Sequence, residues 1–119
     1  MTAITETLHA GGFMISEANG TYSRDAGTLR IGNDLAAGTV LMDSGSTDSL
    51  GRKIVTAWTD GDAIGVLWDA ADATSVAQSV AYVARAAEVR FADLTYASQT
   101  AVTAADVKDA LKAIGIVCR

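Results

Sequence analysis

Residues that could perform catalysis are few and far apart in this sequence. His9 is the single histidine and Cys118 the single cysteine, so a nucleophile–base pair would have to join opposite ends of the chain. Nothing rigid near Gly11 and Gly12 would orient the His9 imidazole as a general base, and a surface or contact role is expected instead. Cys118 follows Val117 in an apolar run, which favours a small buried side chain over a reactive thiol. The sequence predicts no catalytic residue, and a small enzyme using Cys118 is the weaker interpretation.

Metal and nucleotide sites are not indicated either. The stretch DSGSTDS, bracketed by Asp43 and Asp48, has the composition of a calcium loop but lacks its ordered ligands and its distal Glu, so a solvated turn is expected. One His and one Cys provide no short-spaced zinc pair. The glycines of residues 31–38 do not have the spacing of a phosphate-binding loop. No metal and no other cofactor is expected.

Two tryptophans, Trp58 and Trp68, flank a predicted hairpin whose turn contains Asp60-Gly61. Their rings could stack on a sugar or a base, but packing in a core or a trimer interface is the commoner fate of such residues. A small oligomeric β-rich module that binds a glycan or another small ligand therefore remains an alternative function.

Composition limits the partners. The net charge is −5 and the nine basic residues are scattered, which argues against nucleic-acid binding. No stretch approaches the roughly 18 consecutive apolar residues of a membrane span, and no signal peptide is recognised. A single cysteine cannot form an internal disulfide, as suits a cytosolic setting. With 119 residues the chain is expected to form one domain.

Short stretches of alternating or β-branched residues predict a mainly β domain over residues 29–119. Strands are expected at 29–31, 39–42, 52–58 and 63–68, with two more within 79–94 that are separated near Ala86-Ala87. The 63–68 strand is continuously hydrophobic and should be buried on both faces. Asp60-Gly61 predicts a hairpin between it and the preceding strand. Residues 43–51 are expected to be a loop, whereas 69–78 could be a loop or one helical turn.

One helix is predicted near the C-terminus. Thr103 can cap it and Asp106 follows three residues later, as in a capping box. Its apolar face would consist of Val107, Ala110, Leu111 and Ile114. Gly115 should end the helix in a left-handed conformation, with a short strand after it. The fold class is α+β and mainly β: a small β-barrel-like (β-tulip) domain with one C-terminal helix.

Residues 1–28 show no sustained period and are predicted to be an extended N-terminal arm, with at most a short strand at 12–16. Its apolar residues are Leu8, Phe13, Met14 and Ile15. An apolar but unpatterned arm buries itself poorly against its own domain, and Gly11-Gly12 would allow its backbone to approach another chain closely.

Four segments in the same order resemble the head decoration proteins of lambda-type tailed bacteriophages. They are ETLHAGGFMISEANGTYSRD (6–25), LAAGTVLM (35–42), DGDAIGVLWDAADA (60–73) and ALKAIGIVCR (110–119). The resemblance spans nearly the whole chain. It implies a small mixed β/α protein without enzymatic activity that trimerises and sits at three-fold points on the outer surface of the capsid, where it locks the expanded shell. The implied partners are the chain itself, as a homotrimer, and the major capsid protein; synthesis would take place in the host bacterial cytoplasm.

This resemblance gives the arm an expected role. Residues of about 6–20 would become ordered on the capsid by adding a strand to a capsid sheet. The predicted capsid contacts are Leu8, His9, Gly11, Gly12, Phe13, Met14 and Ile15.

Overall fold

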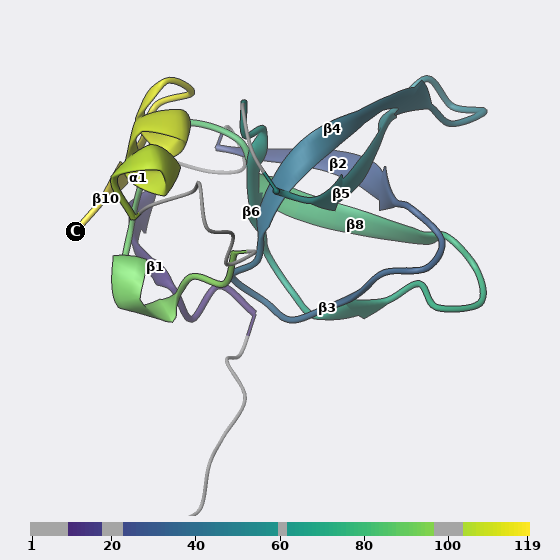
Figure 1. The fold of residues 1–119 in the computed structure, drawn as a ribbon, viewed down its shortest axis with the longest axis horizontal. Helices are drawn as coiled ribbons and strands as arrows, with labels where there is room; N and C mark the ends of the chain where they lie inside the picture. Colours follow the sequence, from purple (N-terminus) through teal and green to yellow (C-terminus); the bar gives the residue numbers. More distant parts are fainter. Residues whose placement is uncertain (1–9, 18–22, 60–61, 97–103) are drawn as a thin grey trace, which may run out of the picture.

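The computed structural model describes residues 10–17, 23–59, 62–96 and 104–119 (Figure 1). The elements in chain order are β1 (Met14–Glu17), β2 (Arg24–Leu29), β3 (Asp34–Leu35), β4 (Val40–Thr47), β5 (Lys53–Ala57), β6 (Gly65–Leu67), β7 (Ala71–Asp72), β8 (Gln78–Val83), β9 (Ala87–Val89), the 3₁₀ turn η1 (Phe91–Asp93), α1 (Ala104–Lys112) and β10 (Ile116–Cys118). The prediction of a mainly β fold with one helix near the C-terminus is confirmed.

Five of the strands close into a barrel in the order β2-β5-β4-β6-β8. All of its pairings are antiparallel except that of β2 with β5. The longest, between β2 and β8, runs from Arg24↔Val83 to Leu29↔Gln78. β2 begins at Arg24, so residues 24–28, which the sequence places in the arm, are part of the barrel wall.

Each barrel strand contributes a buried side chain to one apolar cluster, which we assign to the barrel interior. These side chains are Leu29, Leu41, Val55, Leu67 and Tyr82. Gly65 is required beside them, because a Cβ atom at this position would lie 2.2 Å from the carbonyl oxygen of Val83 and 2.8 Å from the Tyr82 ring.

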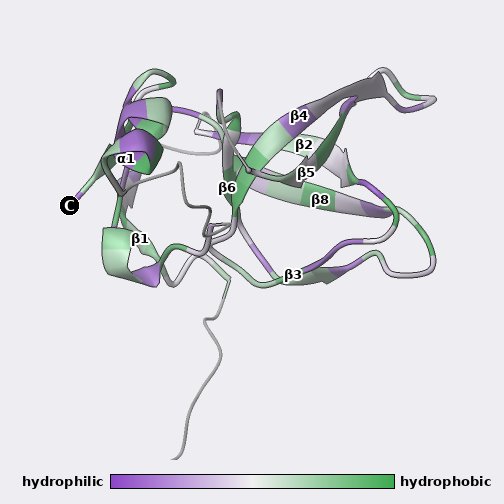
Figure 2. Ribbon diagram, viewed as in Figure 1, coloured by the Kyte–Doolittle hydropathy of each residue, from purple (hydrophilic) through white to green (hydrophobic). Residues whose placement is uncertain are grey.

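A second apolar cluster, which we call the outer cluster, covers the outside of β4, β6 and β8. Val40, Val66 and Val83 are the neighbours of interior residues on these strands, and strand alternation directs their side chains to the opposite face. Figure 2 shows apolar residues on all three strands. The predicted burial of the 63–68 strand on both faces is confirmed, because all three residues of β6 are buried.

The cover over this wall comes from α1 and from a small sheet with the order β1-β9-β10. Val107 and Leu111 of α1 are fully buried and Ile114 is half-buried, as the apolar helical face predicts. Gly115 has a φ of +87° and directs the chain into β10. Thr103, the predicted cap, lies outside the described residues.

The predicted hairpin between residues 52–58 and 63–68 is wrong. β5 and β6 are not paired; β4 lies between them and forms antiparallel pairs with both. A strand that is apolar on both faces belongs next to β4 and β8, under the covering layer, and not in a two-stranded ribbon. The turn residues Asp60 and Gly61 lie outside the described residues.

The loop predicted for residues 43–51 is shorter than expected, because β4 continues to Thr47 and forms a hairpin with β5. Asp48 holds the turn together. Its carboxylate accepts hydrogen bonds from the Thr28 hydroxyl at 2.6 Å, from the backbone N–H groups of Leu50 and Arg52 at 2.9 Å, and from Arg52 Nε at 3.0 Å. Within residues 69–78, which the sequence left open, β7 forms a two-stranded ribbon with β3.

Leu111→Ala should lower the free energy of unfolding by about 2–5 kcal/mol, because it leaves a cavity between α1 and the barrel wall. Leu50→Ala is the matched control: Leu50 is 75% exposed at the tip of the β4–β5 hairpin, and the same change there should cost less than about 0.5 kcal/mol. Urea unfolding of both variants measures the difference. Similar losses would show that α1 does not carry core residues.

The Asp48 hydrogen bonds predict a stability change in acid. The Thr28 hydroxyl is the largest influence that lowers the pKa of Asp48, from 3.8 to about 2, assisted by the Leu50 and Arg52 donors. Because the pKa of Asp48 is lowered in the folded state, the stabilisation from this carboxylate is complete above pH 3.8. It is lost as the pH falls toward about 2. NMR titration should show the low value in the native chain and a higher one in Thr28→Val. An unchanged pKa in that variant would contradict this assignment.

Candidate docking surface on the small sheet

The β1-β9-β10 sheet is an open sheet beside the closed barrel. β1 runs antiparallel to β9, with Met14 opposite Val89 and a register shift before Ser16. β10 runs parallel to β9, with Val117 opposite Glu88. The two strands joined through β9 therefore come from opposite ends of the described chain.

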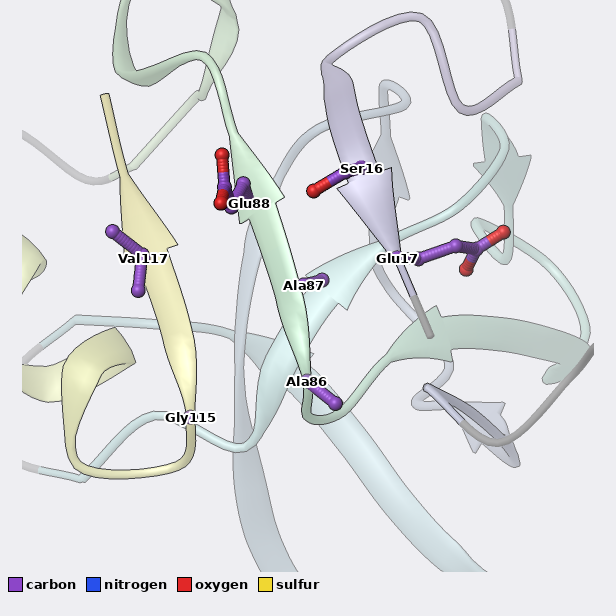
Figure 3. A pocket seen from close by; sticks show the side chains of 7 residues that line it. All are labelled: Ser16, Glu17, Ala86, Ala87, Glu88, Gly115 and Val117. Carbon is purple, nitrogen blue, oxygen red and sulfur yellow. The ribbon is translucent and has the colours of Figure 1, made fainter. Parts of the chain in front are cut away.

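One face of this sheet is turned away from the core. Ala87 and Val89 of β9 are buried, while Glu88 between them is only half-buried and points outward. Ser16 and Val117 lie opposite Glu88 on the two flanking strands, so the three side chains form a row across the sheet (Figure 3). They border a shallow hollow of about 380 Å³, which also includes Glu17, Ala86 and Gly115 in its lining. We call this surface the outer face of the small sheet.

The N-terminal side of β1 is anchored on Trp68. The backbone N–H of Gly11 donates to the Trp68 carbonyl oxygen at 2.9 Å. Gly11 has a φ of +67°, and a Cβ atom there would lie 2.4 Å from Cη2 of the Trp68 ring, so only glycine fits. Phe13 contacts the same indole edge-on, with 6.3 Å between ring centroids.

The C-terminal end of β1 is anchored on Arg24. Arg24 Nη2 donates to Glu17 Oε1 at 2.5 Å and Nε donates to Oε2 at 3.2 Å, and the Ser23 hydroxyl also donates to this carboxylate. The Arg24 hydrogen bond is the main cause that lowers the pKa of Glu17. The Arg24 guanidinium also lies 3.5 Å above the centre of the Trp68 ring. Both ends of β1 are thus tied to Trp68, one directly and one through Arg24; we call this set of contacts the Trp68 anchor.

Phe13 has a structural role that the sequence does not indicate. The sequence predicts it as a capsid contact of the arm, and in the structure its side chain is fully buried in the outer cluster, together with Val89 and Leu111. A local pattern cannot reveal this, because those partners are distant in the chain. Of the other arm residues predicted to make contacts, Gly11, Gly12 and Met14 are half-buried, and Ile15 is 43% exposed. Leu8 and His9 lie outside the described residues.

The two tryptophans do not form a stacking platform. Trp58 is 1% exposed and belongs to the core, as the commoner fate of a tryptophan predicts. Trp68 is half-buried, with Arg24 over its ring, Phe13 against it and Gly11 in contact with it. Because Trp58 is buried and Arg24 lies over the Trp68 ring, the two indoles do not form the shared surface on which the glycan-binding alternative depended.

The groups considered for catalysis and metal binding have structural surroundings where they are described. Cys118 is half-buried in β10, and burial raises the pKa of its thiol, which keeps it protonated at neutral pH. Among the described residues no cluster of three or more His, Cys, Asp or Glu side chains could hold a metal ion. Asp43 accepts a hydrogen bond from the Gly45 backbone N–H within β4, where the pairing with β5 has a register shift. No helix in the described ranges is long and apolar enough to cross a membrane.

The sequence does not indicate the Trp68 anchor. Its patterns suggest stacking for Trp68 and a close backbone approach at Gly11, but they do not indicate a pair between Glu17 and Arg24. Their pairing depends on the barrel bringing β2 and β6 to the start of the small sheet, and no short motif encodes that arrangement.

The fold and the small sheet define a class: a mainly β barrel domain with one open sheet on its covering layer. Comparison with protein families then identifies the chain. It belongs to the family of bacteriophage lambda head decoration protein D, whose profile matches residues 3–116. A comparison with curated proteins found no match. Head decoration is a structural role in the phage capsid, and the resemblance noted in the sequence is confirmed.

Phe13→Ala should destabilise the free protein by about 3–5 kcal/mol, because it empties a filled position under the small sheet. Ile15→Ala, two residues later on the exposed side, should have an effect below about 1 kcal/mol. Thermal unfolding of the two purified variants provides the comparison. If Phe13→Ala left the melting temperature unchanged, the burial of this ring in the free protein would be refuted.

Proposed function

We propose that this chain is a non-enzymatic protein that binds as a homotrimer to the outer surface of the expanded phage head, at three-fold positions, and stabilises it. The observation that carries the proposal is the family match over residues 3–116. The protein would be made in the cytoplasm of the host bacterium and would become part of the virion.

The N-terminal segment is the proposed attachment element. Residues that precede Gly11, including Leu8 and His9, would add a strand to a sheet of the major capsid protein. The Trp68 anchor supports this assignment, because it fixes the backbone at Gly11 and gives the segment a defined point of departure from the domain. Ile15, exposed on β1, would extend the contact. Phe13 would contribute indirectly, by holding β1 on the domain.

Trimerisation would make weak arms sufficient. Ordering a flexible segment costs roughly 1–2 kcal/mol per residue, so one short arm alone would bind weakly. Three arms on one particle can raise the apparent affinity by about 10²–10⁴ without a new kind of contact. A protein that binds the expanded lattice better than the unexpanded one stabilises the expanded state by the same difference in free energy.

Deletion of residues 2–9 tests the arm. The truncated chain should keep its melting temperature and its trimeric mass in analytical ultracentrifugation, because the Trp68 anchor and β1 are retained. Its binding to expanded heads should fall by about 100-fold or more. A variant with residues 2–9 replaced by a Gly/Ser segment of equal length is the control for chain length and should bind as weakly.

Two results would contradict parts of this proposal. Unchanged head binding by the truncated chain would remove the arm as the attachment element. A monomeric mass for the native chain would remove the homotrimer and the multivalency argument with it.

A further inference from the structure

β1 is attached to the small sheet on one side only. It is the outer strand in the order β1-β9-β10, and none of the described strands pairs with its other edge. Its pairing with β9 is interrupted by the register shift between Met14 and Ser16, and such a shift disrupts the ladder of hydrogen bonds. Residues 11–17, which we call the strap, therefore need a further contact to hold them on the domain.

Arg24 supplies this contact from the barrel. The Glu17 side chain points away from β9, toward the unpaired side of β1 (Figure 3). Its carboxylate accepts two hydrogen bonds from the Arg24 guanidinium, at 2.5 and 3.2 Å. The same guanidinium lies 3.5 Å from the centre of the Trp68 ring, and the ring and carbonyl group of Trp68 contact Gly11. Arg24 thus holds the end of the strap directly and its start through the indole.

Arg24 and Trp68 are themselves fixed without the strap. Arg24 is opposite Val83 at the first position of the β2–β8 pairing. The Trp68 backbone N–H donates to the Ala81 carbonyl oxygen of β8 at 3.0 Å. Side chains that extend from rigid elements position their partners more precisely than side chains on loops do.

We propose that Arg24 is a positioning residue for the N-terminal segment: it holds the strap closed through Glu17 and Trp68, and the strap opens separately from the barrel when this hold is weakened. A forked, charge-assisted hydrogen bond is among the strong ones, and the cation over the indole face adds to it. The use of this device rests on the proposed function, because the arm would leave the domain at the start of the strap. The contacts that form it do not depend on that function.

Amide hydrogen exchange of the free native chain, followed by NMR at low urea concentrations, tests whether the strap opens as a unit. The Gly11 N–H donates to the Trp68 carbonyl oxygen, and the Arg90 N–H donates to the Phe13 carbonyl oxygen. Both N–H groups become exposed when the strap opens. They should exchange together, faster than the Leu67 N–H of β6 and with a weaker dependence on urea, because this dependence grows with the surface that an opening exposes. One common rate and urea dependence for all three amides would overturn the proposal.

Arg24→Gln tests the hold itself. The variant loses the charge and the forked donor, so exchange at Gly11 and Arg90 should accelerate at least about 10-fold. The Arg52 N–H, bonded to Asp48 in the β4–β5 hairpin, lies outside the strap and should keep its native rate. Unchanged exchange at Gly11 and Arg90 would overturn the proposal.

Arg119→Gln is the matched control. Arg119 pairs with Glu88 at 2.9 Å, so this variant also removes an arginine–glutamate pair from the small sheet, but one that joins β10 to β9 and remains when the strap opens. It should leave Gly11 exchange unchanged, and an acceleration equal to that in Arg24→Gln would overturn the proposal. If Arg24→Gln does not fold, Glu17→Gln weakens the same pair from the strap side and replaces it under the same criteria.

A double variant tests the action through the indole. In Trp68→Leu the ring between Arg24 and Gly11 is missing, so adding Arg24→Gln should accelerate Gly11 exchange by a smaller factor than it does in the native chain. Equal factors in the two backgrounds would overturn the positioning of Gly11 through Trp68. All these measurements use the free protein, so their result is separate from that of head binding by the chain lacking residues 2–9.

Discussion

The structure depends on one wall of the barrel that is apolar on both faces. In β4, β6 and β8, adjacent residues alternate between the barrel interior and the outer cluster: Val40 with Leu41, Val66 with Leu67, and Tyr82 with Val83. The inner face is covered by the other strands of the closed barrel. The outer face would be left in water unless other segments covered it, and each buried side chain of this kind is worth roughly 1.5–3 kcal/mol. The covering layer is therefore obligatory.

This requirement explains why segments from both ends of the chain meet on the same layer. Phe13 comes from the N-terminal side, Leu111 and Ile116 come from the C-terminal side, and all three are fully buried over the wall. β1 and β10 accompany them as the two flanking strands of the small sheet. The segments that bury the wall are thus the same segments that present the outer face.

Sequence periodicity predicted part of the local structure, although the strand expected at 29–31 ends at Leu29 and Ile31 lies in a turn. The C-terminal helix, the break near Ala86 and the doubly buried β6 follow from patterns within a few residues, and Ala86 has the positive φ, 51°, that such a break requires. The order of strands in the barrel did not follow, because β4 between β5 and β6 is a pairing of distant segments. A turn signal at Asp60-Gly61 indicates that the chain reverses, but not which strand it then joins.

The sequence predicts neither the burial of Phe13 nor the Trp68 anchor, and both failures have the same cause. Residues 10–17 do not show a helical or strand period of their own because their packing is set by β9 and Trp68, far along the sequence. An unpatterned apolar segment can therefore belong either to a partner or to a covering layer, and sequence alone does not separate the two. In the folded domain the Gly11 backbone lies close to the Trp68 ring, and this contact places the segment in the covering layer.

The fold protects its strand edges in different ways. A closed barrel has no free strand edges, so its backbone groups are satisfied internally and offer nothing to another chain. The β3–β7 ribbon does have edges, but Asp34 and Asp72 face each other across it, and charge protects an edge from unwanted pairing. β10 carries no charged side chain, but its Ile116 is fully buried, so the backbone groups of this residue are protected by packing and not by charge.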